Sequence, residues 1–471
     1  MQANPARMMT TQNISDPAPA ARAAKMYLVA AFAVGQALHV NDGNLHPVAL
    51  LWITLAMIAV VFGLTGRGAW LDRFSVTKIA VVCLAIEWID LVAWGIGFRR
   101  APGASSIGFV IPMLIAGFGA TLLFSKSRER LGLMMLIAGH FFAGADVIRS
   151  TKPPVIDALY FQEQSTAALV HGENPYTVRY RNIYGASTAY YSAAICDGDY
   201  LTVSHPYPPL TLLLAAPARV TGDLRWSHLI ALELAAVLMV ISYAREHETG
   251  DRIYSCQSLC GIAPAMMLFC PRALMVVYFG WTETFVVLCI AAVVCFAVRR
   301  PRWSWVVLGL AIASKQYMVL ALPTMWLIAD RKTLIKSITL AAGITLPFVL
   351  WSPAAFFRSV VLMQMLQPFR LDALSFPAIL ARFTGLQIPS IVAFIAAGIA
   401  IVWSIRRAPR SVGGFSAAVT LVFLVFFALN KQAFCNYYFL TAATSCCAAA
   451  TSLRRVAVVE IQQALELKRA A

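Results

Sequence analysis

The chain has 471 residues, of which 60% are hydrophobic and only 13% are charged, and its formal net charge is +16. A soluble domain carries about 25% charged residues, so this composition excludes an ordinary soluble protein. It predicts an all-α polytopic membrane protein with about 13–14 transmembrane helices. Most of the Lys and Arg residues lie in short loops between apolar runs, which excludes a nucleic-acid-binding patch as the source of the charge.

Five apolar runs precede the first long polar segment. Residues 1–25 are rich in Ala and Pro and predict a disordered cytoplasmic tail, and residues 26–130 carry the first group of spans. The runs lie at 26–40, 47–64, 76–97, 106–124 and 131–147. The basic residues of the short loops place both termini in the cytoplasm and the polar segment outside a plasma (inner) membrane, by the positive-inside rule.

The polar segment, residues 148–209, interrupts the apolar pattern. Asp157 begins a stretch without Gly or Pro that ends at Gly172, which predicts a helix. Asp157 either caps this helix or acts as a general base on an acceptor hydroxyl. His171 and His205 are candidates for a metal pair, for pH-sensitive groups or for hydrogen-bonded interface residues. We predict no cofactor, and a divalent metal is left open.

The second half of the chain contains one unusual segment. Residues 303–329 have basic residues at both ends, so they must enter the membrane and return to the same side. Ser314-Lys315-Gln316-Tyr317 interrupts this segment, which predicts two short helices that meet at a polar break inside a cavity. The other runs lie at 210–220, 226–243, 254–270, 273–297, 333–351, 388–404, 412–429 and 436–451, with an outer loop at 352–387 and a cytoplasmic tail at 452–471.

The ten cysteines do not predict a disulfide framework, because eight of them lie in apolar runs and only Cys196 lies in the polar segment. Cys256 and Cys260 are four residues apart, as on one helix face, but no His or acidic residue lies near them in the sequence. Packing is therefore favoured over metal binding at this pair.

Several motifs occur in a fixed order along residues 131–451. After Asp157 come the segments Leu169-Val170-His171-Gly172-Glu173-Asn174-Pro175-Tyr176, Tyr207-Pro208-Pro209-Leu210, Gly280-Trp281-Thr282-Glu283, Ser314-Lys315-Gln316, Lys431-Gln432 and Asn436-Tyr437-Tyr438. This order resembles the GT-C superfamily of glycosyltransferases that use polyprenyl-phosphate-linked sugars. It is closest to the bacterial polyprenol-phosphate-mannose-dependent mannosyltransferases. The four spans at 26–124 are additional to the family pattern.

The resemblance implies a function. The protein would move a sugar, mannose or another hexose or pentose, from a polyprenyl-phosphate donor to an envelope glycolipid or glycan acceptor on the outer face. Asp157 would be the general base of an inverting transfer, and cations would bind the phosphate of the leaving group. The candidate donor- and substrate-binding residues are Lys315, Gln316, Tyr207, His205, Asn174, Tyr176, Lys431, Asn436, Tyr437, Arg358, Arg370 and Glu283.

Two other function classes stay open at this point. A secondary transporter or lipid flippase would use Lys315, Glu283, Glu87 and Asp90 as a coupling path, although no internal repeat is present. A non-catalytic assembly partner would leave Asp157 replaceable. Glu87 and Asp90 have a structural alternative, which is pairing with polar groups of a neighbouring helix. For Lys431 the alternative is an interfacial side chain that snorkels to water.

Overall fold

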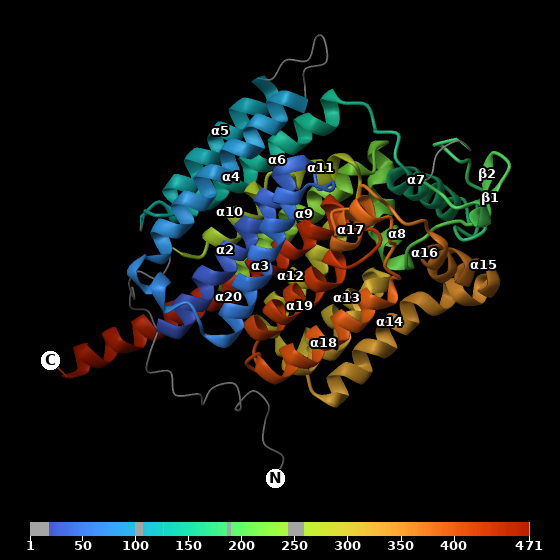
Figure 1. Cartoon of the computed structure of the whole chain (residues 1–471). Coiled ribbons are helices and arrows are strands. Elements are labelled where there is room, and N and C mark those ends of the chain that lie inside the picture. The colour runs from blue at the N-terminus through green and yellow to red at the C-terminus, as the bar shows by residue number, and fades with distance from the viewer. Residues whose placement is uncertain (1–17, 99–106, 126, 186–189, 244–258, 471) are drawn as a thin grey trace.

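The computed structural model describes residues 18–98, 107–125, 127–185, 190–243 and 259–470, and these residues form an almost entirely helical bundle (Figure 1). The all-α prediction is confirmed. By length and composition, five of the described helices are long and apolar enough to cross a membrane, namely α2 (Ala18–Asn41), α3 (Pro47–Thr65), α6 (Glu129–Ser150), α9 (Arg225–Tyr243) and α14 (Arg331–Trp351). Two further predicted spans lie in long helices, Val76–Phe98 (α4) and Cys435–Ala470 (α20), whereas shorter or interrupted helices occupy others such as 273–297 and 303–329.

The N-terminal helices follow the first five predicted runs. They are α2 (Ala18–Asn41), α3 (Pro47–Thr65), α4 (Val76–Phe98), α5 (Ile107–Leu122) and α6 (Glu129–Ser150), with a 3-10 turn at Ala69–Arg73. Helix α2 begins eight residues before the predicted start at Met26, inside the predicted disordered tail. The polar side chains of this extension are satisfied, because Arg22 donates to the Gly66 carbonyl at 2.9 Å and Lys25 to the Leu71 carbonyl at 3.0 Å.

The polar segment folds as a small layer beside the bundle. It contains α7 (Asp157–Val170), a 3-10 turn (Ala193–Ile195), the antiparallel strands β1 (Cys196–Asp197) and β2 (Tyr200–Leu201), and α8 (Pro209–Ala215), followed by a 3-10 turn (Ala216–Thr221). Gly172, with a φ of 76°, follows the end of α7 as predicted. The rings of Phe161 and Tyr180 stack at 4.6 Å in its core, against Met363 from a later segment.

The later segments are also helical. They are α9 (Arg225–Tyr243), α10 (Ile262–Phe269), α11 (Ala273–Tyr278), α12 (Glu283–Arg299), α13 (Ser304–Ser314), α14 (Arg331–Trp351), α15 (Pro353–Phe357), a π-helical turn (Arg358–Leu362), α16 (Met363–Leu366), α17 (Phe376–Thr384), α18 (Ile391–Arg407), α19 (Val412–Ala428) and α20 (Cys435–Ala470). The predicted outer loop at 352–387 therefore holds α15, α16 and α17. Helix α20 continues through most of the predicted C-terminal tail. Cys256 lies outside the described residues.

Two predicted spans differ from the structure. Residues 273–297 do not form one helix, because Gly280 has a φ of 60° and the chain turns between α11 and α12. The Gly280 carbonyl accepts a hydrogen bond from Gln162 of α7 at 2.6 Å, which holds the turn against the polar segment. In 303–329 the break at Lys315 is confirmed, but the second arm forms two 3-10 turns. Pro323 lies in the second of these and lacks the N–H that an α-helix would use.

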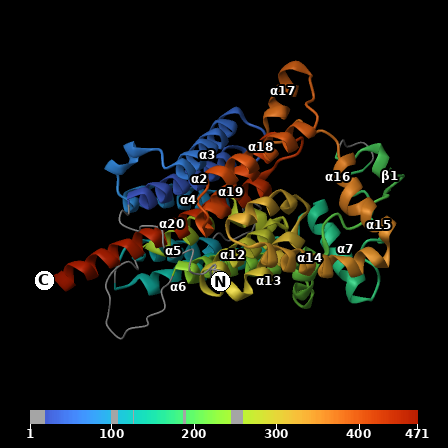
Figure 2. The same cartoon turned by 90° about the horizontal axis from the view of Figure 1, so that it is seen from below.

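Helix α12 lies at the centre of the bundle, packed against α9, α13 and α20. Its first residue, Glu283, therefore lies inside the protein at the end near α7. The C-terminal end of α20 lies on the opposite side of the molecule from α7, α15 and α16 (Figures 1 and 2). The polar segment is thus concentrated at one side of the bundle, over the start of α12.

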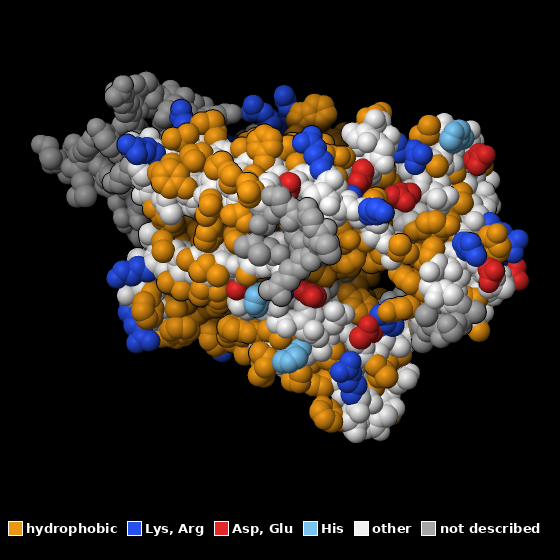
Figure 3. All heavy atoms as spheres, turned by 90° about the horizontal axis from the view of Figure 1, so that it is seen from above, with side chains coloured by type: hydrophobic (Ala, Val, Ile, Leu, Met, Phe, Trp, Pro, Cys, Tyr) orange, Lys and Arg blue, Asp and Glu red, His pale blue; other side chains and the backbone are white. Residues whose placement is uncertain are grey.

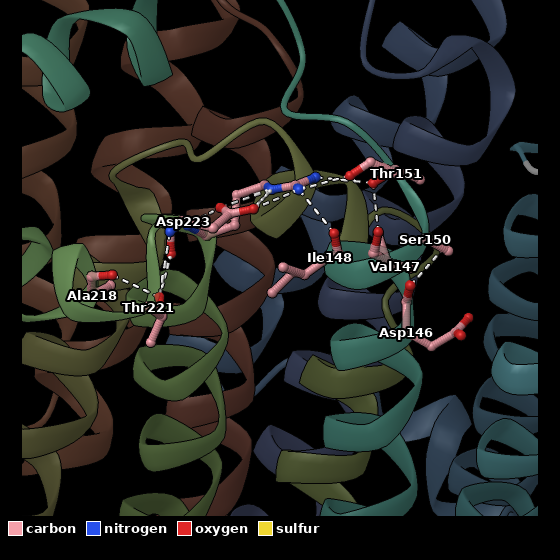
Figure 4. Close-up of polar contacts among 9 residues, drawn as sticks. Asp146, Val147, Ile148, Ser150, Thr151, Ala218, Thr221 and Asp223 are labelled. Carbon is pink, nitrogen blue, oxygen red and sulfur yellow. Dashed lines mark hydrogen bonds and ion pairs between the residues drawn. The ribbon is translucent and has the colours of Figure 1, made fainter.

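The buried guanidinium of Arg225 fixes the path of the chain into the polar segment. Arg225 is only 1% exposed, forms an ion pair with Asp223 at 2.6 Å, and donates to the carbonyls of Ile148 and Thr151 at 2.9 Å (Figure 4). These contacts join the end of α6 to the start of α9. Because α7 follows α6 by only a few residues, this junction also sets where α7 begins.

Candidate active site

Asp157 is the first residue of α7, and Ile156 occupies the N-cap position. The Asp157 carboxylate accepts hydrogen bonds from the Tyr191 hydroxyl at 3.1 Å and from the adjacent Ala158 N–H at 2.7 Å. The Asp157 N–H donates to the Tyr184 hydroxyl at 3.1 Å. The hypothesis that Asp157 is the N-cap of this helix is therefore wrong, although a negative charge in the first turn remains favourable.

The environment of Asp157 suits a proton acceptor. The side chain is half-buried, and burial raises its pKa above the usual value because the charged form loses water. The Tyr191 hydroxyl, the Ala158 N–H, Tyr184 and the positive charge of Arg370 act in the opposite direction. A carboxylate balanced in this way is a stronger base than an exposed Asp, while hydrogen bonds fix its orientation.

Arg370 is the cation whose positive charge lowers the pKa of Asp157. Its guanidinium makes two hydrogen bonds to Asp372, at 2.8 and 2.6 Å, and lies over the rings of Tyr190 at 4.4 Å and Phe434 at 5.0 Å. The two bonds use Nε and Nη2, so Nη1 makes no hydrogen bond to the described residues. On the face seen in Figure 3, acidic and basic side chains gather beside a hollow.

A buried ion pair lies beneath this region. Glu283 is fully buried and Lys315 is 5% exposed, and the Lys315 ammonium lies 3.0 Å from the Glu283 carboxylate. Lys315 also donates to the Thr282 hydroxyl and lies 4.0 Å from the centre of the Tyr207 ring. Asn436 donates to Glu283 at 2.8 Å, and the Tyr317 hydroxyl donates to it at 3.2 Å. The α11–α12 turn, the end of α13 and the start of α20 thus meet at one point.

Tyr207 contacts the buried ion pair through Lys315 and lies within electrostatic reach of Asp157. Burial raises the pKa of the Tyr207 hydroxyl, and the negative charges of Asp157 and Glu283 add to that increase. The Lys315 ammonium also faces the Tyr207 ring. Tyr207 therefore lies within electrostatic reach of both carboxylates.

Three of the predicted residues hold the backbone beside Tyr207. Tyr176 is fully buried and donates to the Tyr207 carbonyl at 2.8 Å, and Asn174 accepts from the Tyr176 N–H at 2.9 Å. Gln316 donates to the carbonyls of Pro206 and, at 3.1 Å, Val360. These contacts orient the backbone of Tyr207, while the buried Asn174 Nδ2 has no hydrogen-bond partner among the described residues.

His205 is fully buried between the rings of Tyr176 and Tyr207, whose centres lie 5.7 and 5.6 Å away. Burial, together with the nearby charge of Lys315, lowers its pKa to about 3, so the ring is neutral. His171 is exposed and contacts the Ala167 carbonyl at 2.8 Å. Among the residues that the structure describes, no group of three or more His, Cys, Asp or Glu could hold a metal ion.

The side chains of two predicted cations make no contact with Asp157 or Glu283 in the described part of the chain, although the Lys431 carbonyl accepts a hydrogen bond from the Arg370 N–H at 3.2 Å. Lys431 donates to the carbonyls of Met365 and Gln367, at 3.0 and 2.5 Å, so its ammonium is bound by protein rather than extended to water. Burial lowers the pKa of Lys431. Arg358 is exposed on the π-helical turn, and no contact joins it to Asp157 or Glu283 within the described part of the chain.

The sequence did not identify Tyr191, Tyr184 or Tyr317 as members of the site. Tyr191 is half of a Tyr-Tyr pair in the polar segment, like Tyr437-Tyr438, and that repeated pair was the available signal. Its contact with Asp157 spans 34 residues, and local pattern carries no information about such a distance.

The intramembrane acids of α4 lie outside this site. Asp90 accepts from Gln36 of α2 at 2.8 Å and lies 3.7 Å from His39, so the pairing alternative is confirmed for Asp90. Glu87 is 1% exposed and packs against Gly35, and its carboxylate has no hydrogen-bond partner among the described residues.

Comparison with known proteins adds one finding. Residues 205–429 match the model of Glycosyltransferase family 87. The match covers just under half of the chain and indicates a GT-C-like membrane glycosyltransferase, which favours the transferase hypothesis over a transporter or flippase. It includes Glu283, Lys315 and Arg370 but begins after Asp157 and ends before α20. No significant match was found among curated proteins or among solved structures.

Proposed function

We propose that this membrane glycosyltransferase takes its sugar from a polyprenyl-phosphate donor and transfers it to an envelope glycolipid or glycan. The half-buried Asp157 carboxylate is the observation that carries this proposal. The Tyr191 hydroxyl donates a hydrogen bond to it, and the positive charge of Arg370 lowers its pKa. The ordered motifs of residues 131–451, the family match and the apolar helices support it as well.

In the proposed reaction Asp157 accepts the proton of an acceptor hydroxyl. The acceptor oxygen then forms a bond to the anomeric carbon while the bond from that carbon to the phosphate oxygen breaks. The electron pair of the broken bond leaves with the polyprenyl phosphate, and the configuration at the anomeric carbon inverts. The role of Asp157 requires its ionised form, so its pKa sets the lower pH limit of the reaction.

Arg370 is proposed as the first cation for the phosphate of the donor. Arginine forms strong hydrogen bonds to phosphate oxygens, and Nη1 of Arg370 is not used by Asp372. Lys315 has a different proposed role. Its ammonium is already engaged by Thr282, Glu283 and the Tyr207 ring, so it positions Tyr207 and neutralises Glu283.

The location and the sugar belong to the same proposal. The basic loops favour an inner-membrane protein with both termini in the cytoplasm and the site on the outer face. A lipid-linked donor suits that face, because nucleotide sugars are made in the cytoplasm. Mannose is the first sugar to test, followed by other hexoses and pentoses.

The decisive experiment replaces Asp157 by Asn in the full-length purified protein. Transfer from radiolabelled polyprenyl-phosphate mannose, and then from other sugars, is measured with an envelope lipid extract as acceptor. Asp157→Asn is expected to bind the donor normally and to lose nearly all transfer, because the amide cannot accept the proton. Asp197→Asn is the matched control, since Asp197 is exposed in the same polar segment and its carboxylate pairs with Arg179 at 3.1 Å. Transfer by Asp157→Asn at the rate of the control would refute the base assignment.

A further inference from the structure

The four additional spans at 26–124 have no role in the reaction proposed above, yet one of their turns contacts the site. Helices α2 and α3 are joined by residues 42–46, and these residues together with Asn41, the last residue of α2, are here called the brace turn. Asp42 has a φ of 52° and Gly43 a φ of 74°, and Asp42 is the single non-Gly residue with positive φ among those the structure describes. Such a tight turn brings the backbone close to the segments that it meets.

The first of these segments carries Arg370. The Leu45 N–H donates to the Asp372 carbonyl at 2.8 Å, and Asn44 and Ala373 form an antiparallel bridge. The side chain of Asp372 is the one that holds the Arg370 guanidinium through two hydrogen bonds. The brace turn therefore fixes the backbone of the residue that orients Arg370.

The second segment is the start of α20. A Cβ placed on Gly43 would lie 2.5 Å from the Cα and 2.6 Å from the N of Cys435, so only glycine allows this approach. Cys435 is 1% exposed, and the next residue, Asn436, donates to Glu283. The contact at Gly43 thus lies one residue from the buried ion pair of the site.

The third segment lies between α10 and α11. Arg272 there is 6% exposed, donates to the Asp42 carboxylate at 2.6 Å and donates to the His39 carbonyl at 3.1 Å. These hydrogen bonds from a buried guanidinium fix the brace turn against the segment between α10 and α11. Three elements that are distant in the sequence therefore converge on a turn of six residues.

We propose that the brace turn is a positioning element for the transfer reaction, which holds Arg370 and the start of α20 in the geometry that binds the donor phosphate. This inference rests on the proposed function for its kinetic consequence. It gives the N-terminal helices a role, since α2 and α3 carry the turn and α2 packs along α20. A displacement of about 1 Å at a catalytic group lowers rates by up to about a hundredfold, so a rigid turn can act without touching substrate.

The test compares two glycine variants of the same hairpin. Gly43→Ala adds a methyl group against the Cys435 backbone. Gly66→Ala adds it at the other end of α3, where φ is 68° but nothing lies within 4 Å. Both glycines have a positive φ, 74° and 68°, so both variants strain the backbone and only Gly43→Ala adds a close contact.

Two measurements are made on the full-length protein in detergent. The first is the rate at which Cys435 reacts with a methanethiosulfonate reagent, with the labelled residue identified by mass spectrometry. The second is the donor KM and kcat. Gly43→Ala is expected to label Cys435 faster than Gly66→Ala and to lower kcat/KM at least about tenfold, chiefly through the donor KM. Gly66→Ala is expected to resemble the wild type.

Each outcome of the labelling and kinetic measurements decides one part of the proposal. Equal labelling rates in the two variants would overturn the brace, whatever the activity. Faster labelling with unchanged kinetics would overturn its positioning role. A wild type that transfers no sugar would refute the proposed function, while the labelling rates would still decide whether the brace exists. If Gly43→Ala does not fold, Asp42→Asn removes the Arg272 ion pair without added bulk and tolerates the positive φ of residue 42, and it should likewise label Cys435 faster than Gly66→Ala does.

Discussion

Removal of the Lys315 ammonium should strongly destabilise the protein, because it leaves a charge buried. Lys315→Met keeps an unbranched apolar side chain and isolates the Glu283 carboxylate, which is fully buried. At the observed distance of 3.0 Å, the Coulomb attraction is about 5.5 kcal/mol for an effective dielectric constant of about 20. Loss of one partner from a buried pair typically costs about 3–5 kcal/mol. We expect a decrease of that size in the free energy of unfolding.

The measurement is a double-mutant cycle with Glu283→Gln. The amide retains the hydrogen-bonding shape toward Asn436 and Tyr317 but carries no charge. Lys315→Met combined with Glu283→Gln should therefore recover about 2–3 kcal/mol relative to the sum of the single effects, since neither charge is then left alone. Unfolding is followed by circular dichroism in mixed micelles of detergent and dodecyl sulfate, with refolding as the check on reversibility.

A surface ion pair provides the control. Arg179 lies 3.1 Å from Asp197, almost the same distance, but the two side chains are 63% and 70% exposed. Arg179→Met should cost no more than about 1 kcal/mol because water screens the pair. Additive effects of Lys315→Met and Glu283→Gln, within about 0.5 kcal/mol, would refute the conclusion that these residues form a coupled buried pair.

Three further predictions concern single contacts. Tyr191→Phe removes a hydrogen bond that lowers the pKa of Asp157, so transfer should be lost at a higher pH than in the wild type as the pH falls; an unchanged pH profile of kcat/KM would contradict this. Arg225→Met should lower the free energy of unfolding by about 3–5 kcal/mol, whereas Arg149→Met, on the exposed end of α6, should change it little; equal losses would argue against the buried junction. Lys431→Met should reduce thermal stability without changing the donor KM, because its ammonium binds carbonyls; an increased donor KM would return Lys431 to the phosphate site.

The element boundaries show where local pattern succeeds. The helix from Asp157 to the stop at Gly172 and the polar break at Lys315 were predicted because Gly, Pro and charge act on the backbone locally. The turn at Gly280 was missed, although Gly-Trp-Thr-Glu was noted as a motif. Apolar residues continue on both sides of it, and hydropathy does not distinguish one helix from two that meet at a turn.

Long-range pairing was predictable only in part. The sequence placed Lys315 and Glu283 among the same candidate residues, and a cation inside an apolar run requires a partner. It gave no basis for the contact between Tyr191 and Asp157, or for the contact of Arg272 with Asp42, which spans 230 residues. Lys431 appeared equivalent to Arg370 as a loop cation. Only the structure shows that the charge of Arg370 acts on Asp157, whereas the Lys431 ammonium donates to two backbone carbonyls.

The sequence by itself determined the class of the protein, the approximate position of most helices and the importance of residues 148–209. Composition and the period of apolar residues determine these features, and both are local properties of the chain. The tertiary structure alone decided which groups meet: Asp157 with Tyr191, Glu283 with Lys315 and Asn436, and the brace turn with Cys435. The physical reason is that a buried charge or a close backbone approach depends on the packing of helices that are far apart in the sequence.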